Sequence, residues 1–264
     1  KQVTLKLWHI WAADTESAKK PFEKALQDFQ NENKNIKIEV EGYENQIYKT
    51  KLKTAMAGDE IPDVFFSWGA GFSKPFIKAG KVLAVDNYID DMQDKFKPGT
   101  TENFKGEDGK LYGIPLYSWA AILYCNEELF KANNAKVPDT FDELLEAVKI
   151  FKAKNITPIA VGEKDKWTGM FFQNILAIRT AGVKLSNDAL NGKESFNQKQ
   201  FVDSAAKLEE LVKAGAFGKN AMSLSNNEAQ NEFFLGKAAM RFMGNWEVGN
   251  IESEENKVKG KVIC

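Results

Sequence analysis

The residues of this chain that are best suited to chemistry are carboxylate pairs, one histidine and six tryptophans. The adjacent carboxylates are Asp90-Asp91, Glu127-Glu128 and Glu209-Glu210. Two carboxyl groups about 5 Å apart can hydrolyse a glycosidic bond with retention of configuration. Adjacency in the sequence, however, does not place two carboxyl groups across one bond. Lysines flank the two glutamate pairs, so these pairs are typical of solvated helix faces.

The single histidine and the two cysteines offer little further chemistry. His9 has no serine or cysteine in a nucleophile turn to act with, so the sequence disfavours a hydrolase triad. His9 and the distant Cys125 and Cys264 do not make a zinc site of the usual types, and we expect no metal and no other cofactor. Cys125 is expected to be a small buried residue at a strand end, and a Cys125–Cys264 disulfide stays open.

Four of the six tryptophans follow strand-like runs of the sequence, namely Trp11, Trp68, Trp119 and Trp246. In α/β folds, ligands bind beyond the ends of the strands. A flat, rigid indole surrounded by carboxylates, amides and hydroxyls suits a ligand with apolar ring faces and polar edges. That description fits a sugar, so the pattern indicates a carbohydrate-binding site.

The apolar periodicity predicts an α/β chain. Alternating or continuous apolar runs predict strands at 3–10, 36–41, 63–67, 111–117, 121–125, 158–161 and 238–243. Helical spacing predicts helices at 22–29, 47–56, 139–151, 170–180, 201–212 and 228–235. Thr140 and Glu143 form a capping-box pattern at the start of one helix. Strand and helix alternate in the first block, which predicts right-handed crossovers.

Turn residues and crossing segments predict two lobes. The turn-rich stretch 105–110 is the predicted boundary, and a second crossing is predicted near 246–252. We therefore assign 1–110 plus about 250–264 to an N-terminal lobe and 111–249 to an incomplete C-terminal lobe. Because the boundary is predicted to be strand rather than flexible linker, it predicts a hinge.

Composition and chain ends exclude some functions. A net charge of −1 gives no basic excess for nucleic acid. The apolar runs are strand-sized, so no membrane span is expected. The chain begins with Lys1 and runs straight into a strand, which is typical of a mature protein whose leader has been removed. It stops at Cys264 just as a strand begins, so we expect the chain to be cut there.

Six peptides, in order and spacing together, carry a resemblance to a known family. They are residues 3–11, 52–69, 109–116, 122–130, 137–144 and 234–246. With them the chain resembles, over its whole length, the sugar-binding proteins of bacterial ABC importers, the maltose-binding-protein-like group of extracellular solute-binding proteins. Members of this family continue well past the position that matches Cys264. If the remainder is missing, we expect exposed apolar surface and poor stability of residues 1–264 alone.

The resemblance implies an α/β, two-lobed, periplasmic-binding-protein-like fold of type II, with strands crossing between the lobes. It implies that an oligosaccharide binds in the cleft, that the lobes close on it and that an ABC permease in the membrane recognises the closed form. No bond is made or broken in such a protein. The resemblance places the chain outside the cytoplasm, in the periplasm or lipid-anchored on the cell surface. We expect a monomer, or association with its own missing C-terminal segment, and no nucleic-acid partner.

The resemblance also implies ligand contacts, position by position. Trp68 matches a ligand-lining position after the third strand, and Trp246 matches a stacking aromatic near the crossing segment. Trp119 stands where some members have a carboxylate, which favours stacking. The other candidates lie in contact loops or beside these tryptophans, namely Trp11, Asp14, Glu44, Tyr117, Trp167 and Asn245. Several such rings suit a ligand of about two to four sugar units.

Two alternatives to an oligosaccharide-binding protein remain. One is a carbohydrate-active enzyme that uses a carboxylate pair. The other keeps the family and changes the ligand to a non-sugar solute, such as a polyamine or an iron chelate. A polyamine site would need clustered carboxylates and fewer open indoles, which the tryptophans at strand ends disfavour.

Overall fold

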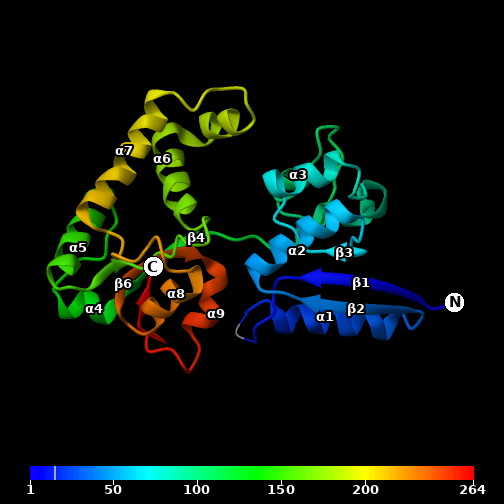
Figure 1. Ribbon diagram of the computed structural model, residues 1–264, viewed down its shortest axis with the longest axis horizontal. Coiled ribbons are helices and arrows are strands. Elements are labelled where there is room, and N and C mark those ends of the chain that lie inside the picture. Colours follow the sequence, from blue (N-terminus) through cyan, green and yellow to red (C-terminus); the bar gives the residue numbers. More distant parts are fainter. Residues whose placement is uncertain (15) are drawn as a thin grey trace. The chain divides into compact units, whose positions relative to one another are not determined.

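The computed structural model describes residues 1–14 and 16–264, which form two compact units, residues 1–119 and 120–264 (Figure 1). Each unit has a sheet of its own with helices packed on it, and each is described by itself. The α/β class predicted from the periodicity is confirmed.

The first unit is built on a three-stranded parallel sheet with the order β2-β1-β3. β1 (Val3–His9) is central and pairs along its whole length with β2 (Ile36–Gly42). β3 (Val64–Phe65) is much shorter. Because the strands are parallel, their carboxyl ends meet at one edge of the sheet. The segments that follow those ends carry Trp11, Glu44 and Trp68.

The helices of the first unit connect and cover these strands. They are α1 (Lys19–Glu32), α2 (Asn45–Gly58) and α3 (Ala70–Lys78), with the 3-10 turns η1 (Asp86–Tyr88), η2 (Asp90–Lys95) and η3 (Glu102–Phe104). α1 runs along β2 (Figure 1). Tyr48, Leu52 and Met56 on one face of α2 form the buried centre of the first unit's core. The hydroxyl of Tyr48 donates to the carbonyl of Phe66 at 2.6 Å, so α2 is fastened to the segment after β3.

The second unit is built on a four-stranded mixed sheet with the order β5-β6-β4-β7. β4 (Ala121–Asn126) runs antiparallel to both β6 (Ala238–Gly244) and β7 (Val262–Ile263). β5 (Thr157–Ile159) runs parallel to β6. β6 is buried at six of its seven positions, as expected of a strand with both faces covered.

The helices of the second unit are α4 (Glu127–Ala132), α5 (Phe141–Ala153), α6 (Gly169–Leu190), α7 (Lys199–Ala214), α8 (Asn226–Phe234) and α9 (Val248–Ile251), with the 3-10 turn η4 (Asn245–Glu247). The capping box predicted at Thr140 and Glu143 is confirmed. α6 and α7 form a helical hairpin (Figure 1). The helix predicted at 170–180 is the first part of α6, which breaks at Gly182, where φ is 79° and ψ is 162°, before a second helical stretch follows.

Residues 111–117 were predicted to be a strand, and this prediction is wrong. Residues 112–120 have no regular structure. Pro115 lacks the N–H that a strand ladder needs. The apolar residues of this segment line a groove in the first unit instead of a sheet face, which explains why their pattern imitated a strand.

The predicted return of residues 250–264 to the first lobe also differs from the structure, in which these residues belong to the second unit. Ile251 and Val258 are buried in the second unit's core, and Val262–Ile263 pair with β4. The units divide after Trp119 rather than at residue 110, because residues 111–118 stay on the first unit.

Both cysteines are free thiols in the structure, although Ile263, next to Cys264, pairs with Cys125 across β4 and β7. Cys125 is buried, as predicted, and its removal from water raises its thiol pKa to about 12. Cys264 is exposed.

Candidate carbohydrate-binding surfaces

The first unit carries a groove of about 1010 Å³ beyond and beside the ends of β1 and β3, which we call the first-unit groove. Its aromatic lining consists of Trp8, Trp11, Phe22, Phe65, Phe66, Trp68, Phe104, Tyr112, Tyr117 and Trp119. Within this lining, and among the described residues, the side chains with a full charge are Asp63 and Lys81. An apolar groove with few charges and several hydroxyls suits a neutral ligand that has apolar faces.

Trp119 and Tyr117 are the most open aromatic residues of the lining, with 52% and 44% of their surface exposed. Exposed aromatic rings of this kind can stack against a ligand. Removal of the phenol from water, together with the negative charge of Glu16, raises the pKa of Tyr117 to about 12. The Tyr117 hydroxyl therefore stays neutral at physiological pH and can both donate and accept a hydrogen bond.

Trp68 is partly buried at the start of the segment after β3. It packs edge-to-face on Tyr48, Phe66 and Phe72, at ring-centroid distances of 5.8, 5.1 and 4.8 Å. The ammonium of Lys49 lies 5.1 Å from the centroid of the indole. These contacts fix the Trp68 ring in one orientation in the wall of the groove, which reduces the ordering that a ligand would have to impose.

Trp11 is 4% exposed, so the structure gives it a packing role rather than an open face. Its ring lies nearly parallel to that of His9 at 5.6 Å and contacts Phe22, Phe66 and Tyr117 at 4.7, 5.4 and 6.3 Å. The backbone N–H of Trp11 donates to Nδ1 of His9 at 3.1 Å, which requires that nitrogen to be unprotonated. Burial lowers the pKa of His9 and so favours this state. Trp11 forms the back of the groove and supports Tyr117.

The two carboxylates predicted to contact the ligand are engaged locally. Asp14 pairs with Lys19 at 2.6 Å, and this hydrogen-bonded ion pair lowers the pKa of the almost fully exposed Asp14 carboxyl. Glu44 is the N-cap of α2 and accepts hydrogen bonds from the N–H groups of Gln46 and Ile47 at 2.8 and 3.3 Å. Both residues lie in loops after strands, as predicted, but the structure itself assigns them an ion pair and a helix cap.

The second unit brings together three rings that are well separated in the sequence. Phe171 lies between Trp167 and Trp246, with ring-centroid distances of 5.8 and 6.1 Å. Both tryptophans are partly buried and pack against the core formed by Tyr124, Met243 and their neighbours. We call this group of three rings the second-unit aromatic cluster.

Close contacts determine where the tryptophans of this cluster lie. The indole of Trp246 folds back over the α-carbon of Gly244, so closely that a side chain at Gly244 would collide with it. Trp167 precedes Thr168, whose hydroxyl donates to the Glu163 carboxylate at 2.7 Å, and the same carboxylate accepts the N–H of Gly169 at 2.5 Å. Glu163 thus fastens the loop that carries Trp167 to the start of α6.

Asn245, also predicted as a ligand contact, is exposed and has a structural role as well. Its backbone N–H donates to the carbonyl of Ala120 at 3.0 Å, and its side-chain oxygen accepts the N–H of Ala120 at 3.3 Å. This exchange ties the beginning of the second unit to the turn that holds Trp246.

Sequence reasoning missed Phe171 and the aromatic residues around Trp68. Phe66 was assigned to a strand and Phe72 to no element, and nothing in their spacing shows that their rings meet Trp68. Phe171 lies within the helix predicted at 170–180, but Trp167 precedes the N-cap of α6, so helical spacing does not predict the contact between their rings.

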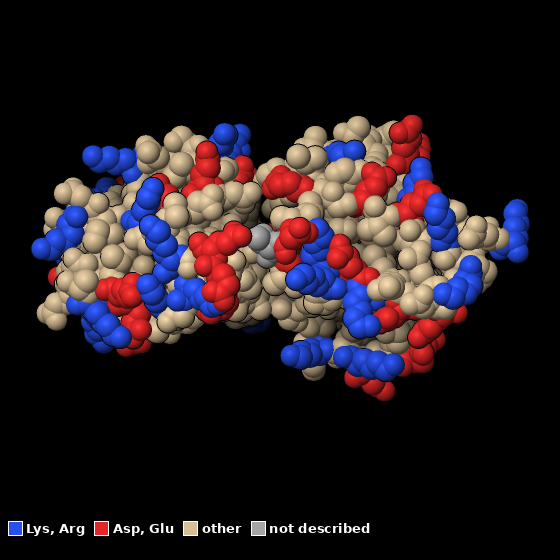
Figure 2. Space-filling model, turned by 90° about the horizontal axis from the view of Figure 1, so that it is seen from below, with Lys and Arg blue, Asp and Glu red and all other residues tan. Residues whose placement is uncertain are grey.

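The glutamate pairs are solvated, as predicted. Glu127 pairs with Lys131 at 2.7 Å, Glu128 with Lys261 at 3.1 Å and Glu209 with Lys213 at 2.8 Å, all with substantially exposed side chains. Figure 2 shows acidic and basic side chains interspersed on the face in view, without a block of one sign.

Within the described part of the chain, no three His, Cys, Asp or Glu side chains gather where they could hold a metal ion. In residues 1–14 and 16–264, no helix has the length and apolar character needed to cross a membrane.

The chain matches the model of the bacterial extracellular solute-binding protein family over residues 12–263, and it belongs to that family. A solved structure from a study of xylan utilization by the thermophilic bacterium Caldanaerobius polysaccharolyticus is 45% identical, with a TM-score of 0.90 over 98% of this chain and 66% of that one. A chitin oligosaccharide binding protein is 30% identical, with a TM-score of 0.86 over 99% of this chain and 66% of that one. The two-lobed type II fold predicted from the resemblance is thereby confirmed.

A multiple sugar-binding protein of Streptococcus mutans is 26% identical over 245 residues, which are 89% of this chain and 56% of that protein. The chain therefore spans just over half the length of this curated relative and 66% of the two solved structures.

Proposed function

We propose that this chain is the major part of an extracellular solute-binding protein that delivers an oligosaccharide to an ABC importer. The observation that carries the proposal is that each unit holds aromatic rings in fixed orientations, with open faces at Trp119 and Tyr117 and few charges around them. Such rings bind the apolar faces of sugar residues, while a neutral lining disfavours a polyamine or another charged solute. The names of two similar proteins, a multiple sugar-binding protein and a chitin oligosaccharide binding protein, support a sugar ligand.

As the ligand we propose first a xylo-oligosaccharide. The reason is the likeness, at 45% identity, to a protein solved in the context of xylan utilization. A chito-oligosaccharide is the second candidate, because a chitin oligosaccharide binding protein is 30% identical to the chain. The candidate contacts are Trp68, Tyr117 and Trp119 of the first unit and Trp167 and Trp246 of the second. Trp11, Asp14, Glu44 and Asn245 are proposed as the residues that support these contacts or border them.

The test is isothermal titration calorimetry on the natural polypeptide that contains this chain, with tetrasaccharides of xylose, N-acetylglucosamine, glucose and mannose. Spermidine serves as the non-sugar control. We expect heat and a change in tryptophan fluorescence with at least one oligosaccharide and none with spermidine. Absence of both signals with every sugar, or binding of spermidine alone, would count against the proposal.

The proposal includes no catalysis. Glu127, Glu128 and Glu209 lie on helices with their side chains substantially exposed and form ion pairs with lysines, which supports a binding protein over the alternative of a glycoside hydrolase. Incubation of the protein with the same tetrasaccharides, followed by a reducing-end assay, distinguishes the two, because a hydrolase would release new reducing ends.

Location and partners follow from the family. We propose that the protein acts outside the cytoplasm, in the periplasm or lipid-anchored on the cell surface, and that an ABC permease receives its ligand. Fractionation of the source cells tests the location. We also propose that the natural protein is a monomer and that further sequence covers apolar residues outside the groove such as Val3, Phe29 and Ile47, which are 49%, 40% and 56% exposed. Light scattering and thermal unfolding of residues 1–264 and of the longer polypeptide test this.

A further inference from the structure

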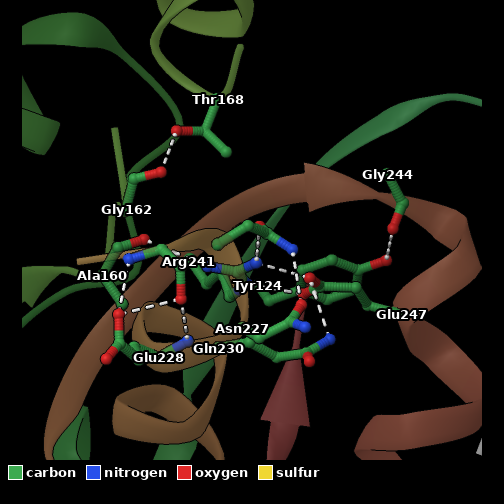
Figure 3. Close-up of polar contacts among 12 residues, drawn as sticks. Tyr124, Ala160, Gly162, Thr168, Asn227, Glu228, Gln230, Arg241, Gly244 and Glu247 are labelled. Carbon is green, nitrogen blue, oxygen red and sulfur yellow. Dashed lines mark hydrogen bonds and ion pairs between the residues drawn. The ribbon is translucent and has the colours of Figure 1, made fainter. Parts of the chain in front are cut away.

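A fully buried ion pair of the second unit includes the residue that follows Trp246. Arg241 of β6 and Glu247 at the end of η4 are both 0% exposed. Nε of Arg241 donates to one Glu247 oxygen and Nη2 donates to the other, each at 2.6 Å, so the pair is bidentate. Figure 3 shows the Arg241 and Glu247 side chains together with Gln230. In the sequence, Glu247 directly follows Trp246.

The same guanidinium joins three segments of the chain. Its Nη2 also donates to the side-chain oxygen of Asn226 at the start of α8, at 2.7 Å, and its Nη1 lies 3.5 Å from the carbonyl of Ala160, just after β5. Gln230 of α8 donates to Glu247 at 3.2 Å. Arg241 is therefore the common partner of the turn after β6, the start of α8 and the end of β5.

One further contact extends this network to the loop that carries Trp167. The backbone N–H of Asn226 donates to the carboxylate of Asp165 at 2.8 Å. Trp167 is two residues beyond Asp165, and Trp246 is next to Glu247. Both tryptophans of the cluster are thus connected through short polar contacts to one arginine.

Stability alone does not explain a buried pair of this kind. The loss of hydration of two ions is costly, and well-packed apolar residues in the same place are often equally stable or more stable. The pair instead fixes the orientation of the residues that carry it, because a bidentate arginine–carboxylate contact holds both side chains in one plane. The neighbouring Trp246 has to be held in a defined orientation, because its indole packs on Gly244 with no room to shift toward it.

We propose that Arg241 is the positioning residue of the second-unit aromatic cluster, which through Glu247 and Asn226 sets the spacing and tilt of Trp246 relative to Trp167. The spacing of these rings then determines which sugar repeat fits across them. This inference rests on the proposed carbohydrate-binding function.

The test replaces the pair with apolar residues and separates binding from stability. The double variant Arg241→Met/Glu247→Leu removes both charges together, so that no buried ion is left alone. Asn226 and Gln230 are partly exposed and can be hydrated once their partner is gone. The matched control is Phe151→Leu, a fully buried residue of the second unit's other core cluster. It should lower the melting temperature without touching the network.

Two measurements are made on the natural full-length protein. The first is the affinity for xylotetraose, or for whichever oligosaccharide the wild-type protein binds, at a temperature where all variants are folded. The second is the NMR position and line width of the Trp167 and Trp246 indole N–H signals without ligand, assigned with Trp167→Phe and Trp246→Phe. We expect the double variant to shift or broaden both signals and to weaken binding about tenfold or more. Phe151→Leu should leave both measurements at the wild-type values.

Wild-type affinity and unchanged indole signals in a folded double variant would overturn the proposal, as would equal loss of affinity in Phe151→Leu. If the double variant does not fold, Glu247→Gln is measured in the same way, since it keeps the volume and removes one charge. Wild-type values for that variant also overturn the proposal. If the wild-type protein binds no oligosaccharide, the proposed function fails, while the indole signals still report whether Arg241 positions the two rings.

Discussion

The replacement of Trp119 by alanine gives the sharpest test of the proposed carbohydrate-binding surface. Trp119 is 52% exposed, so about half of its surface is already in contact with water. Complete burial of a large apolar side chain contributes about 1.5–3 kcal/mol to folding. Trp119→Ala should therefore reduce the free energy of unfolding by only about 1 kcal/mol. The loss should be larger in binding, because a stacking aromatic at the centre of a site contributes about 1–3 kcal/mol. A tenfold change in the dissociation constant corresponds to about 1.4 kcal/mol.

Calorimetry with xylotetraose and chitotetraose measures this effect, and thermal unfolding measures the change in stability. The matched control is Tyr88→Ala, since Tyr88 is an aromatic residue of the same unit that is 70% exposed and does not line the groove. We expect Trp119→Ala to weaken binding about tenfold and Tyr88→Ala to leave it unchanged. Equal affinity of Trp119→Ala and wild type would show that this ring does not contact the ligand. Loss of affinity in both variants would show that the effect is not local.

Three further predictions concern stability and reactivity. Burial lowers the pKa of His9 in the folded protein below its usual 6.5. Near and just below pH 6.5 the unfolded chain therefore binds more protons than the folded one, and the free energy of unfolding should fall as the pH drops through this range. The fall in melting temperature from about pH 7.5 to 5.5 should be smaller in His9→Gln. Thr140→Ala removes the N-cap of α5 and should lower the free energy of unfolding by about 1 kcal/mol in a urea titration. The control is Thr54→Ala, an exposed threonine within α2 whose hydroxyl caps no helix and donates to the carbonyl of Thr50, and it should have a smaller effect. Iodoacetamide at about pH 8 should modify the exposed Cys264 and spare Cys125, whose thiol is buried with its pKa raised to about 12. The folded protein is alkylated, then digested, and the modified cysteines are identified by mass spectrometry. Alkylation of Cys125 at the same rate as Cys264 would contradict the burial of Cys125.

Local patterns in the sequence predicted most elements of the fold. The alternation of Val3, Leu5 and Leu7 predicted β1, and the Thr140–Glu143 pair predicted the start of α5, because each signal depends on residues a few positions apart. The same kind of signal failed at 111–117. There the apolar residues line a groove, and periodicity does not distinguish a groove wall from a sheet face.

The candidate site was predicted in part. Placing tryptophans after strands led to Trp68 and Trp119, which both line the first-unit groove, and to Trp246. It did not reveal that Trp11 would be buried beneath Tyr117 or that Phe171 would connect Trp167 and Trp246. Exposure of a ring depends on what packs on it, and those neighbours come from distant parts of the chain.

The sequence by itself determined the α/β class, the family and the aromatic residues of the candidate surfaces, because these follow from local periodicity, the order of short peptides and the residues at strand ends. Only the tertiary structure decided which rings are open, that residues 250–264 pack on the second unit, and that Arg241 is buried against Glu247. An arginine in a strand has the same appearance in a sequence whether it is solvated or buried. Its burial is stable only where a carboxylate and amide oxygens converge on it, and that convergence is a property of the packed chain.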